Sequence, residues 1–140
     1  MKIVAQGSKQ TDWGMELNWA SNESYAGKLL IFEKPNKKTA MMLHKVRRKS
    51  WFVNSGKFKI TFIDIKTGQS REQVIKEGNT IDIAEMTPHQ LESLDHHSII
   101  FESGTPDYEE DQFRINPGDE QTEPSEQELN PQSFYHHDKE

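Results

Sequence analysis

The amino-acid sequence predicts an all-β domain, and two observations carry this prediction. Short apolar or aromatic runs recur at close spacing, and glycine, proline or asparagine residues stand between them. Over residues 1–115, no apolar pattern with the 3.6-residue period of an amphipathic helix is sustained. Many short strands separated by turns are typical of a β-sandwich or a β-barrel.

Each predicted strand follows from a local pattern. The first run is apolar and ends before Pro35, which cannot donate to a sheet ladder. In the third run, Phe58, Ile60 and Phe62 share one face by the two-residue period of a strand. The later runs are shorter and are separated by glycine-containing turns. The predicted strands are 25–32, 51–56, 57–65, 73–75, 80–83 and 98–102.

The composition divides the chain into two parts. The 140 residues suffice for one domain, but only 32% are hydrophobic and 29% are charged. Residues 103–140 hold 11 of the 23 acidic residues and 2 of the 17 basic ones, whereas residues 1–102 carry a net charge of +3. The sequence after Asn116 has no hydrophobic period and too little apolar surface to offset the cost of ordering. We therefore expect a folded domain over residues 1–115 and an acidic, disordered tail over 116–140.

Composition also excludes several classes of protein. The chain has no cysteine, which rules out disulfides, thiolate metal sites and cysteine nucleophiles. No apolar run approaches the roughly 20 residues that span a bilayer, and the N-terminus is too polar for a signal peptide. The net charge of −6 and a single short basic cluster argue against a nucleic-acid partner. We expect a cytoplasmic protein without a membrane partner.

Two groups of residues are candidates for chemistry. Of the six histidines, His44 and His89 each end an apolar stretch that leads into a predicted strand, where a packed histidine and a ligand both remain possible. The second group is a basic cluster, in which Arg47 and Arg48 are the phosphate-binding candidates and a solvated rim is the alternative. The cluster consists of Lys37, Lys38, Lys45, Arg47, Arg48 and Lys49.

Residues 44–56 and 83–93, with His44 and His89 at their histidine positions, resemble the two cupin motifs. The likeness extends over residues 12–115 through further matching positions, which are Trp13-Gly14, Trp51 and Glu102-Ser103-Gly104. Acidic residues and Arg114 follow the last of these segments. The chain is most similar to the type II mannose-6-phosphate isomerase domain, which also forms the C-terminal domain of mannose-1-phosphate guanylyltransferases. The resemblance implies a double-stranded β-helix (a cupin jelly roll), a homodimer, and a metal bound inside the barrel.

The chain departs from the family pattern at the metal ligands. Val46 stands where the second histidine of the first motif is expected, and Lys49 stands where the glutamate ligand is expected. Only His44 and His89 keep ligand character, and two protein ligands are too few for a tight site. An ammonium at Lys49 pointing into the barrel would also repel a cation. We therefore expect no cofactor, with an incomplete site for Zn, Mn, Fe or Ni at the two histidines left open.

These residues predict a small-molecule-binding cupin whose ligand is a carbohydrate or a sugar phosphate. A metal-dependent isomerase of the mannose-6-phosphate type and a non-catalytic interaction module remain as alternatives, and no catalytic residue is assigned. Polar groups that converge inside a β-barrel are the usual small-molecule site. The expected lining is His44, Val46, Lys49, Trp51 and His89, with Arg114 near the rim, where it contacts substrate or forms a structural ion pair.

Overall fold

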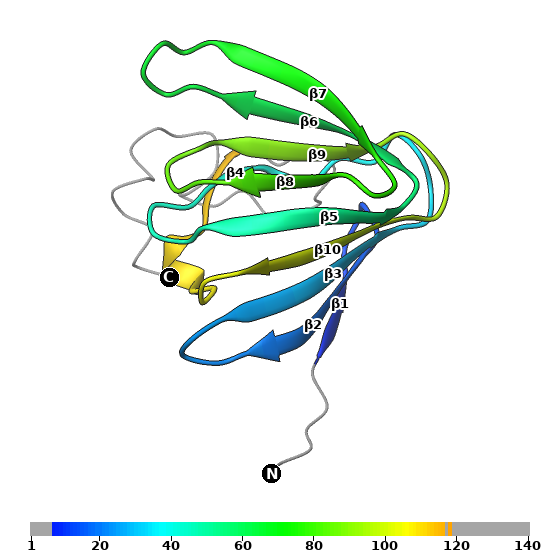
Figure 1. The fold of residues 1–140 in the computed structure, drawn as a ribbon, viewed down its shortest axis with the longest axis horizontal. Helices are drawn as coiled ribbons and strands as arrows, with labels where there is room; N and C mark the ends of the chain where they lie inside the picture. The colour runs from blue at the N-terminus through cyan, green and yellow to red at the C-terminus, as the bar shows by residue number, and fades with distance from the viewer. Residues whose placement is uncertain (1–6, 117, 119–140) are drawn as a thin grey trace.

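In the computed structural model, residues 7–116 and 118 are described, and they form two antiparallel sheets (Figure 1). The strands are β1 (Ser8–Gln10), β2 (Met15–Ser21), β3 (Ala26–Phe32), β4 (Met41–Leu43), β5 (Lys49–Ser55), β6 (Lys57–Ile63), β7 (Ser70–Lys76), β8 (Thr80–Ile83), β9 (His89–Ser93), β10 (Ser98–Gly104) and β11 (Phe113–Asn116). A short 3-10 helix, η1 (Glu109–Asp111), precedes β11. The predicted tail lies outside the described residues, apart from Asn116, which ends β11, and Gly118. Within residues 7–116 and 118, no helix has the length and apolar character to cross a membrane.

The chain passes from one sheet to the other at nearly every connection after β3. The first sheet has six strands in the order β1-β2-β3-β10-β5-β8, and the second has five in the order β11-β4-β9-β6-β7. After β3, only the β6–β7 connection joins neighbours in one sheet, and the other strands alternate between the two sheets. This winding makes a jelly roll and confirms the predicted all-β class (Figure 1).

The six predicted strands are all present, with ends shifted by a few residues. The sequence pattern did not indicate β1, β2, β4, β9 or β11. In β9 the inward positions are His89, Leu91 and Ser93, so two of the three are polar and the apolar alternation is broken. β2 depends on its neighbour, because it pairs with β3 from Met15 opposite Ile31 to Ser21 opposite Ala26. Pairing and burial, rather than local propensity, create these strands.

The inward faces of β3, β5 and β10 divide the interior into an apolar end and a polar end. The ring of Trp13, which lies between β1 and β2, stacks on Phe32 in the apolar end with 4.5 Å between ring centroids. Further along the same faces the side chains become polar, and Glu102 stands opposite both Lys28 and Trp51 in the ladders. The buried apolar core includes Trp13, Leu30, Phe32, Val53, Phe58, Ile60, Leu91 and Ile100. The register therefore places charged side chains beside a continuous core.

Two glycines make this arrangement possible. Gly104 stands opposite Lys49 in the β5–β10 ladder, and a Cβ atom there would come within 2.8 Å of the Lys49 Cβ. Gly56, in the turn between β5 and β6, has a φ of 81° and lies against Ser98. The first glycine leaves space for an inward lysine, and the second supplies a left-handed backbone conformation that side chains disfavour.

Candidate functional site

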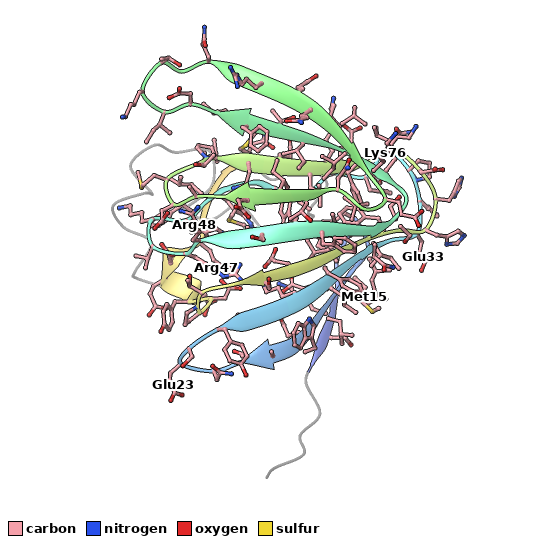
Figure 2. The ribbon with its side chains drawn as sticks, viewed as in Figure 1. Met15, Glu23, Glu33, Arg47, Arg48 and Lys76 are labelled. Carbon is pink, nitrogen blue, oxygen red and sulfur yellow. The ribbon has the colours of Figure 1, made fainter. Side chains whose placement is uncertain are left out.

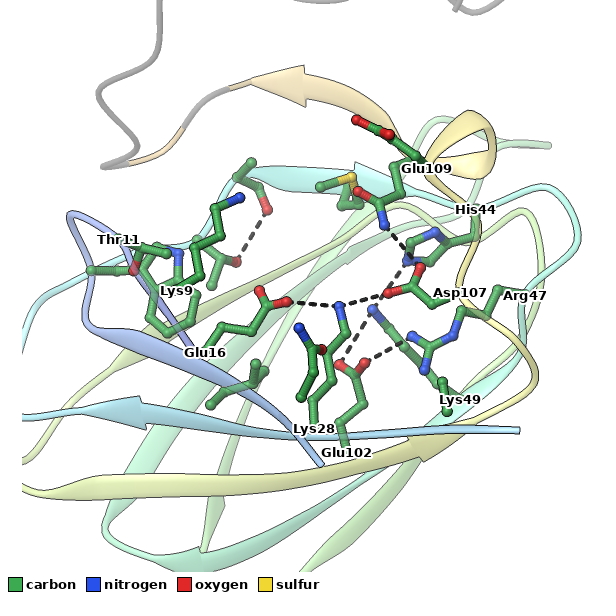
Figure 3. Close-up of a pocket in the computed structure, with 18 of the residues that line it drawn as sticks. Lys9, Thr11, Glu16, Lys28, His44, Arg47, Lys49, Glu102, Asp107 and Glu109 are labelled. Atoms are coloured by element: carbon green, nitrogen blue, oxygen red, sulfur yellow. Dashed lines mark hydrogen bonds and ion pairs between the residues drawn. The ribbon is translucent and has the colours of Figure 1, made fainter. Parts of the chain in front are cut away.

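A cavity of about 820 Å³ adjoins the polar end of the interior and is lined by residues from both sheets. Figure 3 shows the side chains of Glu16, Lys28, Arg47, Lys49, Glu102 and Asp107 gathered together from β2, β3, β5, β10, the β4–β5 loop and the loop before η1. Of the residues predicted to form the site, the cavity is lined by His44, Arg47, Lys49, Trp51, His89 and Arg114. The tertiary structure therefore brings together most of the predicted pocket.

Glu102 is the centre of the deepest charged cluster. Its Oε2 accepts a hydrogen bond from Arg47 Nη1 at 2.8 Å, and its Oε1 accepts one from Trp51 Nε1 at 2.8 Å. Lys49 Nζ lies 3.6 Å from Oε1. Burial by itself raises the pKa of Glu102, but Lys49, Arg47 and Lys28 outweigh burial and hold this pKa well below its ordinary value. Glu102 is therefore a buried carboxylate that stays ionised.

A second cluster surrounds Lys28 on the neighbouring strand. Its Nζ forms ion pairs with Asp107 at 2.6 Å and with Glu16 at 2.9 Å (Figure 3). Burial opposes the charge on Lys28, but Glu102, Glu16 and Asp107 outweigh burial and raise its pKa. Gln112 Nε2 donates to Asp107 Oδ1 at 2.8 Å. Two carboxylates therefore hold the Lys28 ammonium in place.

His44 and Lys49 form a direct contact inside the cavity. His44 Nδ1 lies 3.0 Å from the backbone carbonyl oxygen of Asp111, so Nδ1 carries the proton and donates it to that oxygen. The unprotonated Nε2 accepts a hydrogen bond from Lys49 Nζ at 3.1 Å. Burial and then the charge of Lys49 lower the pKa of His44 to about 4. Burial also lowers the pKa of Lys49, and the carboxylate of Glu102 offsets only part of that effect.

His89 presents a second neutral imidazole to the same cavity. Its Nδ1 donates to the carbonyl oxygen of Thr87 at 2.8 Å, which leaves Nε2 as an acceptor. Burial and then the charge of Lys49 hold the pKa of His89 well below its ordinary value. The ring centroids of His44 and His89 lie 5.5 Å apart. Nε2 of His89 and Nη2 of Arg47 are buried and have no hydrogen-bond partner among the described residues.

Val46 was predicted to line the pocket, and this prediction is wrong because its side chain is 67% exposed and lies outside the cavity lining. Residues 44–48 lie between β4 and β5 and do not follow the alternation of a strand. The carboxylate of Asp111 accepts hydrogen bonds from the backbone N–H groups of Lys45, Val46 and Arg47 at 2.7–3.2 Å. This turn directs His44 and Arg47 inward and Val46 outward.

The basic cluster is divided in the same way. Arg47 and Arg48 are adjacent at the loop before β5, but Arg47 is buried against Glu102 and Arg48 is 57% exposed (Figure 2). Arg48 Nη1 lies 3.8 Å from Glu85 Oε1 and is not part of the cavity lining. A solvated rim describes Arg48 but not Arg47 or Lys49. Arg114, on β11, lines the cavity.

The family resemblance implies a divalent metal inside the barrel, and this chain keeps only His44 and His89 of the expected ligand positions. Among residues 7–116 and 118, no three histidine or carboxylate side chains are placed to hold a metal ion together. Nε2 of His44 already accepts a hydrogen bond from Lys49, and the two oxygens of Glu102 accept hydrogen bonds from Arg47 and Trp51. This set of donors does not fit a tightly held divalent metal.

Sequence reasoning missed Glu102, Lys28 and Asp107 as site residues. A usable signal existed for Glu102, because the two-residue period of β10 places it on the same face as the buried Ser98 and Ile100. Asp107 lies in a loop, where no periodicity indicates the direction of a side chain.

Comparison with known proteins identifies the fold. No family model and no curated protein match this sequence. Among solved structures, oxalate decarboxylase from Bacillus subtilis has a TM-score of 0.70 at 15% identity over 82% of this chain and 33% of its own. The capsular polysaccharide assembling protein CapF from Staphylococcus aureus has a TM-score of 0.68 at 16% identity over 78% of this chain and 34% of its own. The chain has the cupin fold.

A third structural neighbour, an oxalate decarboxylase from Lactobacillus farciminis solved as a formate complex, agrees with this fold. Its TM-score is 0.66 at 19% identity, over 79% of this chain. This chain covers about a third of the length of each of these three neighbouring chains. At such low identity the likeness establishes the architecture alone, because one fold can serve many functions.

Proposed function

We propose that this cupin domain binds a small carbohydrate in the cavity without a resident metal. The observation that carries the proposal is that two residues lining the cavity each hold a buried atom without a hydrogen-bond partner among the described residues, Arg47 Nη2 and His89 Nε2. Leaving a buried polar atom unpaired costs about 1–3 kcal/mol, so a ligand that pairs these atoms gains affinity. One atom is a donor and the other is an acceptor, and hydroxyl groups can pair with both because they donate and accept.

The charges at the cavity favour a neutral ligand over a sugar phosphate. Arg47 and Lys49 face Glu102, and Lys28 faces both Asp107 and Glu16. A phosphate dianion would have to compete with these carboxylates for the cations and would experience their repulsion. Arg48, the other predicted phosphate-binding residue, is exposed and lies outside the lining. A sugar phosphate therefore remains the less favoured alternative.

Two further observations support a carbohydrate. Trp13 and Trp51 are among the residues that line the cavity, so apolar side chains lie beside the polar groups, as in most small-molecule sites. The structural neighbour CapF is named for capsular polysaccharide assembly, which is also carbohydrate chemistry. The resemblance to mannose-6-phosphate isomerases points to the same class of ligand, although an isomerase of that kind depends on a metal.

The proposal is tested by calorimetric titration with a panel of aldoses, alditols and sugar phosphates. We expect neutral sugars or alditols to bind more tightly than their phosphates. His89→Phe removes the unpartnered acceptor while keeping a flat ring, so binding should fall at least roughly tenfold. His96→Phe is the matched control, because His96 is an exposed histidine outside the cavity lining, and its binding should be unchanged. Absence of binding across the panel, or an equal effect of the two substitutions, overturns the proposal.

Elemental analysis of protein purified without chelator and without a metal-carrying affinity tag tests the metal-free part. About one Zn, Mn, Fe or Ni per chain would overturn it and would favour the isomerase alternative. A content far below one metal per chain supports it.

A further inference from the structure

Lys49 has a position in the cavity that carbohydrate binding does not require. The residue is 8% exposed and lines the cavity, and its Nζ lies closer to the neutral imidazole of His44, at 3.1 Å, than to the carboxylate of Glu102, at 3.6 Å. Glu102 already forms a direct ion pair with Arg47 at 2.8 Å, whereas Lys49 Nζ lies 3.6 Å away. A buried ammonium is costly unless it is well paired, so an ion pair alone is a weak reason for a lysine here.

We propose that Lys49 is a nucleophile that forms an imine with the carbonyl carbon of an aldehyde or ketone ligand, such as the open-chain form of a reducing sugar. The inference rests on the proposed function, because the ligand occupies the same cavity. It adds a covalent step, which reversible hydrogen bonding to hydroxyl groups does not supply.

The contact with His44 provides a transient acceptor for the proton that Nζ loses in this step. An ammonium is not nucleophilic, so Nζ must first lose a proton, and the Nε2 atom of His44 is an unprotonated acceptor 3.1 Å away. The orientation of that acceptor is fixed on the other side of the ring, where Nδ1 donates to the Asp111 carbonyl oxygen at 3.0 Å. A lysine, an adjacent proton acceptor and a group that orients this acceptor together resemble the arrangement of an activated nucleophile.

The step balances without an oxidant or a reductant. The Nζ–C bond forms as the carbonyl π bond breaks, and the oxygen takes a proton to give a carbinolamine. The C–O bond then breaks, and the oxygen leaves as water with the two protons that Nζ gives up, one of them relayed through His44. The product is an iminium ion with the same charge as the original ammonium. Glu102, 3.6 Å from Nζ, is placed to stabilise that charge before and after the reaction.

Reductive trapping tests the inference on the whole chain. The protein is incubated with glyceraldehyde and cyanoborohydride, which reduces an imine to a stable amine, and the modified lysines are located by peptide mass spectrometry. We expect Lys49 to gain the mass of the aldehyde less one oxygen atom, roughly tenfold or more faster than the exposed Lys66. Lys49→Arg keeps the charge but cannot form the imine, so it should abolish the fast phase, whereas Lys66→Arg should leave it unchanged. Lys49→Met serves the same purpose if the arginine does not fit.

Two results overturn the inference: modification spread evenly over the lysines, or a fast phase that survives Lys49→Arg. Alditols lack a carbonyl group, so they separate this inference from the proposed function. If alditols bind and Lys49 is not trapped, the imine fails and carbohydrate binding stands. If Lys49 is trapped but no sugar or alditol binds, the imine stands and carbohydrate binding fails. Protection of Lys49 by a bound alditol supports both.

Discussion

Replacing Glu102 with glutamine would remove one negative charge from the centre of the cavity while keeping the shape of the side chain. The amide oxygen can still accept the hydrogen bond from Trp51 Nε1. Arg47, whose side chain is 1% exposed, would lose its carboxylate partner at 2.8 Å, and Lys49 would lose the one at 3.6 Å. Breaking a fully buried ion pair costs about 3–5 kcal/mol. We expect the free energy of unfolding to fall by about that amount.

The assay is urea unfolding at pH 7, followed by tryptophan fluorescence. Glu72→Gln is the matched control, since Glu72 is 61% exposed and lies 3.6 Å from Lys59, and an exposed pair of this kind contributes less than about 1 kcal/mol. Combining Glu102→Gln with Lys49→Met removes one of the two unbalanced cations and should recover about 1–2 kcal/mol, which also provides a measurable variant if the single one does not fold. A loss below about 1 kcal/mol for Glu102→Gln would refute the reasoning.

Three further predictions follow from burial, backbone conformation and the exposed face. Lowering the pH from 7 to 4 should cost about 3 kcal/mol of stability through His44 alone. The pKa of His44 is about 4 in the folded chain and near the ordinary value of 6.5 in the unfolded chain, so the unfolded chain takes up the proton first. Urea unfolding that gives the same free energy of unfolding at both pH values would contradict this prediction. Gly56→Ala should destabilise the protein by more than about 2 kcal/mol, because the backbone has a φ of 81° and an added Cβ atom would collide with Ser98. Gly68→Ala, where φ is 75° and the space is open, should cost only about 1 kcal/mol in the same unfolding assay. Equal losses for the two substitutions would refute the role of Ser98. We expect the predicted homodimer to form through the outer face of the six-stranded sheet, where Phe101 is 44% exposed. Phe101→Asp should therefore give a monomer when the molar mass is measured by light scattering. A molar mass unchanged by the substitution would exclude this face as the dimer interface.

The all-β class could be predicted because it depends on local information. Alternating residues such as Phe58, Ile60 and Phe62 indicate a strand wherever one face is buried, and glycine or asparagine between runs indicates a turn. The missed strands have no such signal. β9 carries His89 and Ser93 on its inward face, and these polar residues are buried because the neighbouring strands cover them.

The candidate site could be predicted in part for a similar reason. His44, Lys49 and His89 were found through motif positions, and the structure gathers them at one cavity. The prediction for Val46 failed because a side chain outside a strand takes its direction from its turn, and Asp111, more than sixty residues later, shapes that turn.

The sequence by itself determined the all-β class, the strands with alternating apolar residues, and the presence of two histidines and a lysine at motif positions. Only the tertiary structure decided that Arg47 is buried, that Glu102 joins it to Lys49, and that His44 faces the lysine with an unprotonated nitrogen. The physical reason is that strand propensity and turn formation depend on neighbours in the chain, whereas charge pairing and desolvation depend on residues that folding brings together from β5, β10 and the loop between β4 and β5.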